Sequence, residues 1–322
     1  MSVYTSLDAG DIQPLLDNYG QGSLIEFKGI EAGIENTNYF VSAESKASRR
    51  NEFVLTLFET TSTENLDGYF DLMAYLAGAG LPAAMPFKCK HGTYLTTVKG
   101  KPAALIERLT GTSANVPNRE QCGAVGRFMA LMHRALSSQE MEFTNARGAE
   151  WRAATITKLT AQLSADQLEI LNAAHHSALT FEQANIPRGV IHGDLFHDNA
   201  LYEGNELKGV IDFYYAHRAP HIYDLAVCIA DWCFVQNGCV MNSENAAAVL
   251  EGYQTERELS AAERGWWIEA MQLAGLRFYL SRLHDKHFPR PGSLTQEKDP
   301  SVFLALITLC RNRSAEITSL VS

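Results

Sequence analysis

The stretch VIHGDLFHDNALY, residues 190–202, constrains the fold and chemistry of this chain more than any other segment. An apolar lead-in typical of a buried strand runs directly into a polar segment with two histidines, two aspartates and an asparagine. A second apolar run, GVID, follows and ends at Asp212. Asp and Asn favour turns, so any one of these residues would be explained by a turn. Three of them at the ends of apolar strands, Asp194, Asn199 and Asp212, are better explained by a shared site.

The order of these three residues fits chemistry on a phosphoryl group. Protein-kinase catalytic loops have the same order, H-x-D-x-x-x-x-N, then a pair of strands, then an aspartate. A carboxylate such as Asp194 can accept the proton of an attacking hydroxyl, and Asn199 and Asp212 offer the oxygen ligands that Mg²⁺ prefers. His192 and His197 also suggest a metal pair. A loop after a strand gives them no helical i, i+4 face, so we do not expect them to be ligands.

The short segment between Asp212 and Asp224 limits which kind of acceptor the protein can use. Asp212 is followed by FYYAHRAPHIY, and Asp224 then begins a helix, DLAVCIADWCF. A protein kinase needs a longer activation segment than this to dock a peptide, and its A-P-E motif is absent from the sequence. The acceptor is therefore expected to be a small molecule.

Hydrophobic periodicity divides the chain into a β-rich first part and a mainly helical second part. The expected elements of the first part are a helix over 12–20, strands over 23–30, 36–43 and 51–59, a helix over 66–80, and strands over 92–100 and 101–109 that form a hairpin at Gly100 and Lys101. From about residue 111 the pattern is helical, and a capping box at Ser260 and Glu263 opens a long helix. Short strand-like pieces around the polar segment predict a small inserted sheet. The fold class is α+β with two lobes, and such a fold places its site in the cleft between them.

Composition excludes several classes of protein. The chain is 46% apolar and has a net charge of −10, which repels phosphate backbones, so no nucleic-acid partner is expected. No apolar run reaches about 18 residues, and the N-terminus is not a secretory signal, so no membrane association is expected. The six cysteines form no C-x-x-C pair and are interpreted as buried thiols of a cytoplasmic protein. The chain is expected to be a monomer or a homodimer.

The strings HGDLFHDN, GVIDF and DLA resemble the aminoglycoside phosphotransferase and choline kinase superfamily. Longer strings, among them FKGIEAGIENTNYFV, FVLTLFE, YDLAVCIADWCF and LRFYLSRLHD, resemble the bacterial homoserine kinases of that superfamily over nearly the whole chain. This resemblance implies a bilobal protein-kinase-like fold. A small antiparallel sheet with a helix, residues 1–108, would bind nucleotide, and a larger helical lobe, residues 109–322, would carry catalysis and acceptor binding.

The implied reaction is transfer of the γ-phosphoryl group of ATP to the hydroxyl of L-homoserine, with Mg²⁺, in threonine biosynthesis. Two alternatives stay open. One is a kinase for another small alcohol, such as choline, methylthioribose or an aminoglycoside. The other is a nucleotide-binding regulator without turnover.

The resemblance also implies roles for individual residues. Asp194 would be the catalytic base, and Asn199 and Asp212 would hold Mg²⁺. The turn EAGIEN would cover the ATP phosphates, and residues 107–109 would form the hinge that meets adenine. The residues implied in nucleotide binding are Gly33, Glu35, Asn36, Asn38, Glu107 and Leu109. His133 and Asp224 would be structural.

One departure from the superfamily concerns an expected ion pair. Many members carry a Lys on the third strand and a Glu on the following helix, but Thr56 and Tyr69 stand at these positions here. The absence of both partners is physically consistent, because a buried charge without its partner would destabilise the fold. Lys28 is a candidate for the missing cation. The departure is also what keeps the regulator alternative open.

Homoserine needs a carboxylate partner, an ammonium partner and a group that holds its hydroxyl. An Arg fork suits the carboxylate, and Arg277 and Arg282 lie on the predicted C-terminal helix. Asp231 could pair with the ammonium, with Trp232 beside it, and Tyr214 follows the expected metal aspartate by two residues. A cluster of aromatic residues here also leaves choline open, because choline calls for an aromatic cage.

Overall fold

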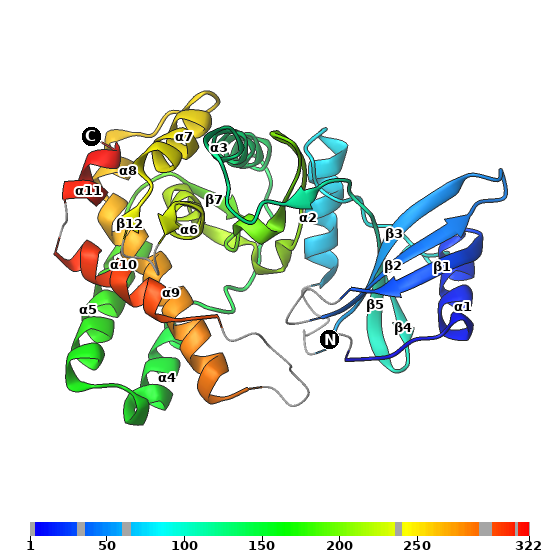
Figure 1. Cartoon of the computed structure of the whole chain (residues 1–322), viewed down its shortest axis with the longest axis horizontal. Coiled ribbons are helices and arrows are strands. Elements are labelled where there is room, and N and C mark those ends of the chain that lie inside the picture. Colours follow the sequence, from blue (N-terminus) through cyan, green and yellow to red (C-terminus); the bar gives the residue numbers. More distant parts are fainter. Residues whose placement is uncertain are drawn as a thin grey trace. The chain divides into compact units, whose positions relative to one another are not determined.

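The computed structural model describes residues 4–30, 36–59, 66–235, 240–289, 298–312 and 315–321. The chain forms two compact units (Figure 1). The first lies within Met1–Thr110, and the second lies within Gly111–Pro289 and Glu297–Ser322. Each unit is described by itself below.

The first unit is built on a five-stranded antiparallel sheet in the order β1-β2-β3-β5-β4. Its elements are α1 (Ala9–Tyr19), β1 (Ser23–Gly29), β2 (Thr37–Glu44), β3 (Arg50–Leu57), α2 (Leu66–Gly78), β4 (Leu95–Val98) and β5 (Lys101–Glu107). Alternate residues of a strand point to the same face, so Tyr39, Val41 and Ala43 of β2 join one core. α1 contributes Ile12 and Leu16 to that core, and both are fully buried. The strands and helices predicted for this part of the chain are confirmed.

The predicted hairpin is confirmed, but its turn lies one residue earlier than expected. Val98 pairs with Lys101, so the turn residues are Lys99 and Gly100. Both have positive φ, 48° and 76°, as a type I′ turn requires. Lys101 is therefore the first residue of β5.

The second unit is mainly helical (Figure 1). Its larger helices are α3 (Arg119–Ala135), α4 (Ala149–Leu159), α5 (Ala165–Glu182), α6 (His221–Trp232), α7 (Ser243–Gln254), α9 (Trp267–His287) and α10 (Ser301–Arg311). α9 packs against α5, α6 and α10, and α3 packs along α7. The predicted capping box is present, but it opens a short helix, α8 (Ala261–Gly265), and the long helix begins after a break at Trp266. No helix in the described ranges is long and apolar enough to cross a membrane.

Glycines allow the close packing of α3 on α7. A Cβ built on Gly126 would lie 2.0 Å from the carbonyl oxygen of Val249, a distance that real Cβ atoms do not reach. On the same helix, a Cβ on Gly123 would lie 3.7 Å from the carbonyl oxygen of Ala248, which is ordinary contact. The two glycines therefore form a matched pair for testing this packing.

We expect Gly126→Ala to lower the free energy of unfolding by about 1–3 kcal/mol, because the two backbones must separate to admit the methyl group. Gly123→Ala should leave it unchanged or raise it by up to about 1 kcal/mol through helix propensity. Urea unfolding of both variants checks this. Equal stability of the two variants would contradict the packing argument.

The small sheet predicted around the polar segment is in fact two sheets. β7 (Arg188–Ile191) pairs with β10 (His217–Pro220), whereas β8 (Ala200–Glu203) and β9 (Glu206–Val210) form a hairpin that β6 (Thr112–Ser113) extends. Cys89, Cys122, Cys228, Cys233 and Cys310 are free and buried, as predicted, and Cys239 lies outside the described residues.

Candidate active site

The loop of residues 192–199 connects β7 to β8 and carries Asp194. Gly193 in this loop has φ of +75°, a conformation that favours glycine. A Cβ at this position would also lie 2.7 Å from the carbonyl oxygen of Tyr215 and 3.1 Å from the ring of His217. The loop can therefore turn sharply after the buried strand only because residue 193 has no side chain.

Asp224 on α6 holds the start of this loop. Its carboxylate accepts hydrogen bonds from the backbone N–H groups of His192 and Gly193, each at 2.9 Å, and lies 3.0 Å from Nε2 of His133. Asp224 is fully buried. Burial by itself raises the pKa of Asp224, but the hydrogen bond and charge of His133 and the Gly193 N–H together hold that pKa below its ordinary value. The structural role expected for His133 and Asp224 matches this geometry.

The middle of the loop is held by two further residues of α6. Oδ2 of Asp231 accepts from the backbone N–H of His197 at 2.8 Å and lies 2.6 Å from Nδ1 of the same residue. The buried Trp232 donates from Nε1 to the carbonyl oxygen of Leu195 at 3.0 Å. Both residues were expected to contact the acceptor. In the structure, Oδ2 of Asp231 and Nε1 of Trp232 brace the loop through its backbone and through His197.

Asn199 and Asp212 lie at the same end of the β8–β9 hairpin. The carbonyl oxygen of Asn199 accepts from the N–H of Ile211 at 3.0 Å, which places the residue before Asp212 beside Asn199. Nδ2 of Asn199 donates to the carbonyl oxygen of Asp194 at 2.9 Å, so its Oδ1 is the atom left to accept or coordinate. Asp212 has φ of +65°, which is unusual for a residue with a side chain and is typical of functional positions. An amide oxygen and a carboxylate so placed fit a hard cation such as Mg²⁺.

Arg277 lies beside Asp194. Nη2 of Arg277 is 3.2 Å from Oδ1 of Asp194, and the arginine is 6% exposed. Its guanidinium lies 4.9 Å from the ring centroid of Tyr215 and 3.9 Å from that of Phe278. A cation is thus fixed next to the carboxylate expected to receive the hydroxyl proton.

The other predicted acceptor residues are placed differently. Arg282 donates to the carbonyl oxygen of Asp299 at 2.8 Å and lies over the ring of Phe303, and burial lowers the pKa of Arg282. Tyr214 lies in a 3-10 turn just after Asp212, and burial raises the pKa of its hydroxyl. Among the five predicted acceptor residues, Arg277 forms an ion pair with Asp194.

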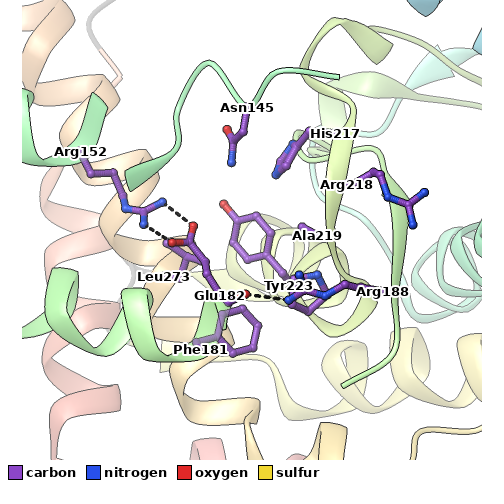
Figure 2. A pocket seen from close by; sticks show the side chains of 11 residues that line it. Asn145, Arg152, Phe181, Glu182, Arg188, His217, Arg218, Ala219, Tyr223 and Leu273 are labelled. Carbon is purple, nitrogen blue, oxygen red and sulfur yellow. Dashed lines mark hydrogen bonds and ion pairs between the residues drawn. The ribbon is translucent and has the colours of Figure 1, made fainter. Parts of the chain in front are cut away.

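A cavity of about 140 Å³ lies in the second unit (Figure 2). Arg152 of α4, which is 1% exposed, forms a two-pronged ion pair with Glu182 of α5 at 2.9 and 2.7 Å on one side of it. Asn145, His217 and Tyr223 also line the cavity, and the same three residues line a smaller pocket at Gly193 and Arg277. No pattern in the sequence pointed to this region, because the segment around Asn145 resembles neither a strand nor a helix.

Part of the predicted nucleotide site lies outside the described residues, namely Gly33 and Glu35. Oδ1 of Asn36 is buried and has no hydrogen-bond partner among the described residues. Asn38 on β2 pairs with Thr56 on β3, and the Thr56 hydroxyl donates to Oδ1 of Asn38 at 2.7 Å. At the position where the resemblance described above led us to expect a Lys, this unit therefore has a neutral hydrogen bond.

The remaining residues considered for nucleotide binding also lie in the first unit. Glu107 ends β5, and its backbone N–H donates to the carbonyl oxygen of Met85 at 2.8 Å. Leu109 follows that strand. Tyr69 on α2 is buried, and Lys28 lies on β1 opposite Phe40.

Three histidines near the 192–199 loop are buried, namely His192, His217 and His221. Burial lowers the pKa of His192, of His217 and of His221, in the last case to about 2. The unfolded chain therefore binds more protons than the folded one, and the stability these groups contribute is full above about pH 6.5 and is lost as the pH falls.

We expect the free energy of unfolding to fall below pH 6 by about 1.4 kcal/mol per pH unit for each of these histidines, until the pH reaches the folded-state pKa. Urea unfolding at pH 6.0 and 5.0 measures this slope. His221→Leu should make the slope shallower by about 1.4 kcal/mol per pH unit, whereas the exposed His176→Leu should not. An unchanged slope in His221→Leu would contradict the prediction.

Comparison with known proteins shows which family this chain belongs to. The sequence profile described as the phosphotransferase enzyme family matches residues 26–265. The chain belongs to the phosphotransferase enzyme family. This phosphotransferase is 41% identical to the homoserine kinase of Methylobacillus flagellatus over 303 residues, which cover 94% of this chain and 93% of that protein. It is 36% identical to the homoserine kinase of Neisseria meningitidis serogroup B, with coverage of 95% and 99%.

Solved structures confirm the fold class of the phosphotransferase. An amicoumacin kinase in complex with AMP-PNP and Ca²⁺ superposes with a TM-score of 0.68 at 18% identity, and the match covers 94% of each chain. An ethanolamine kinase of Plasmodium vivax gives 0.60 at 13% identity, covering 89% of this chain and 82% of that one. The predicted α+β kinase-like fold and the prediction of an enzyme of the kinase class are both confirmed.

Proposed function

We propose that this phosphotransferase transfers the γ-phosphoryl group of ATP to the hydroxyl of L-homoserine, giving O-phospho-L-homoserine and ADP in threonine biosynthesis. The observation that carries the proposal is the likeness to homoserine kinases over nearly the whole chain, at 41% and 36% identity in the two relatives described above. The proposal includes a cytoplasmic location, which suits the free buried thiols.

In this reaction the hydroxyl oxygen of homoserine forms a bond to the γ-phosphorus while the bond from that phosphorus to the β–γ bridging oxygen breaks. ADP leaves with the bonding electrons, and the hydroxyl proton passes to the carboxylate of Asp194. The transfer is a single in-line step without a phosphoenzyme. The protein contributes mainly by positioning the hydroxyl and by balancing charge.

The metal in the proposal is Mg²⁺, held by Oδ1 of Asn199 and the carboxylate of Asp212. When bound, it neutralises charge on the transferred phosphoryl group. The chain's own residues prepare this site, because the β8–β9 hairpin keeps Asn199 beside Ile211 and so close to Asp212. On the nucleotide side, we assign Asn36 and Asn38 to the phosphates, with Gly33 and Glu35, and the backbone of Glu107 and Leu109 to adenine.

The placement of Arg277 supports homoserine over the cationic alternatives. Because Arg277 lies 3.2 Å from Asp194 and balances its charge, the pair offers no net negative charge to the quaternary ammonium of choline or to the several ammonium groups of an aminoglycoside. Homoserine does not need one, since its ammonium is balanced by its own carboxylate. Trp232 is buried and engaged with Leu195, so it does not supply an aromatic cage for choline.

The proposal is tested by ADP release from the purified protein with Mg-ATP and one acceptor at a time. The panel is L-homoserine, L-serine, choline, methylthioribose and kanamycin. We expect kcat/KM for L-homoserine to exceed that for every other acceptor by at least about 100-fold, which corresponds to about 2.7 kcal/mol of differential binding in the transition state. Faster turnover of another acceptor would replace homoserine in the proposal. Turnover of none would overturn it.

A further inference from the structure

We propose that Arg147 recognises the carboxylate of the acceptor, and that it does so as the partner of Arg277 across the ring of Tyr215. This inference rests on the proposed function. It adds a specificity-determining residue in a segment that neither the sequence patterns nor the family's catalytic motif singles out.

The first observation is the pocket itself. It adjoins the 192–199 loop at Gly193, and its wall includes Arg147, Tyr215 and Arg277. Its volume is about 10 Å³, which is about the room that one water molecule needs. The neighbouring cavity of about 140 Å³ shares three of its lining residues, so the body of a small acceptor has space to extend there. A pocket of this size at Gly193 and Arg277 suits one end of a small molecule.

The second observation is how Arg147 is held. Its guanidinium lies over the ring of Trp151 at 4.6 Å and 5.9 Å from the ring centroid of Tyr215, and its Nη2 is 3.5 Å from the Tyr215 hydroxyl. Its backbone N–H donates to Oδ1 of Asn145 at 3.0 Å, which fixes the loop before α4. Two aromatic rings and a local hydrogen bond therefore position this side chain before any ligand binds.

The third observation is that Arg147 has unmet hydrogen-bonding capacity. Its Nε is buried and has no hydrogen-bond partner among the described residues. A buried donor left unsatisfied costs about 1–3 kcal/mol. A carboxylate satisfies a guanidinium through two parallel hydrogen bonds, which is the arrangement that this side chain is shaped to make.

The fourth observation is the balance of charge. Arg152 in the neighbouring cavity is paired with Glu182, and Arg277 is paired with Asp194. Arg147 contacts rings, a hydroxyl and backbone, but it forms no ion pair with a carboxylate in the described part of the chain. The pocket thus carries one positive charge that nothing in its own walls neutralises, and an anionic group on the acceptor supplies the missing partner.

The test compares L-homoserine with 3-aminopropan-1-ol, which is the same molecule without its carboxylate. In Arg147→Ala we expect the Kd of L-homoserine, measured by calorimetry with AMP-PNP and Mg²⁺ present, to rise by about 10- to 100-fold, as the loss of charge-assisted hydrogen bonds predicts. kcat/KM for L-homoserine should fall by the same factor, and that for 3-aminopropan-1-ol should change by less than about 3-fold. Arg147→Lys should be intermediate, because an ammonium keeps the charge without the fork.

The matched control is Arg134→Ala, which removes an exposed arginine that pairs with Glu256 on the surface. It should leave the Kd of L-homoserine unchanged, and unchanged affinity for AMP-PNP should show that each variant is folded. An unchanged Kd for L-homoserine in Arg147→Ala, or an equal loss of kcat/KM for both acceptors, overturns the inference. If the unaltered protein fails to phosphorylate L-homoserine at all, the proposed function fails instead, and the two failures are distinguishable.

Discussion

Asp194→Asn is expected to lower kcat by about 10²- to 10⁴-fold, the range measured for the loss of a general base. Asparagine keeps the shape of the side chain but cannot take the hydroxyl proton, and it removes the negative charge beside Arg277. The affinity for Mg-ATP should stay within about 3-fold, because the substitution leaves Asn199 and Asp212 intact. Steady-state ADP release measures kcat, and calorimetric titration with AMP-PNP measures the nucleotide affinity.

The same loop offers a matched control for that experiment. Asp198 is exposed and pairs with Lys298 at 3.1 Å, so Asp198→Asn removes an equal charge four residues away. We expect it to change kcat by less than about 3-fold, since an exposed ion pair contributes at most about 1 kcal/mol. Equal losses of kcat in the two variants would show that charge in this loop, rather than proton transfer to Asp194, controls the rate.

Asp224→Ala is expected to lower the free energy of unfolding by about 3–5 kcal/mol. The substitution leaves two backbone N–H groups, those of His192 and Gly193, and one ring nitrogen of His133 buried without their acceptor. Urea unfolding at pH 7 measures the loss, and Asp166→Ala at the exposed start of α5 is the control, with less than about 1 kcal/mol expected. A loss below about 1 kcal/mol in Asp224→Ala would show that the loop is held by other contacts.

The pH dependence of this contribution follows from the lowered pKa of Asp224. The folded-state pKa lies below the unfolded-state value, so the stability is present above the unfolded-state pKa and is lost as the pH falls through the folded-state pKa. The difference between the unaltered protein and Asp224→Ala should therefore be constant from pH 8 to about pH 5 and shrink only in stronger acid. A difference that shrinks between pH 8 and 6 would contradict this account.

The sequence predicted the parts of this protein that local pattern determines. The strands of the first unit show alternation, as at Tyr39, Val41 and Ala43, and burial against a core follows directly from it. The sequence also allowed three polar residues to be grouped into one site, because their order in the chain matches that of kinase catalytic motifs. These residues are Asp194, Asn199 and Asp212.

Other parts depend on contacts that no local pattern records. β7 and β10 are only four residues long, which is too short to show a clear alternation of apolar and polar residues. Their pairing could therefore not be predicted from the sequence. Asp231 and Trp232 could have faced an acceptor as well as a loop, and only the structure shows their bonds to His197 and Leu195. Arg147 meets Tyr215 across 68 residues of chain, a proximity that arises from tertiary packing alone.

The anchoring of the 192–199 loop by a single helix limits which changes of length the chain can accept. Asp224 and Asp231 are seven residues apart on α6, which is close to two full turns, so both carboxylates face the same side. One residue inserted between them would rotate Asp231 by about 100° around the helix axis and detach one end of the loop. The helix can therefore tolerate substitutions between the two aspartates, but not insertions or deletions. We expect functional relatives of this chain to keep the spacing of seven residues between these aspartates.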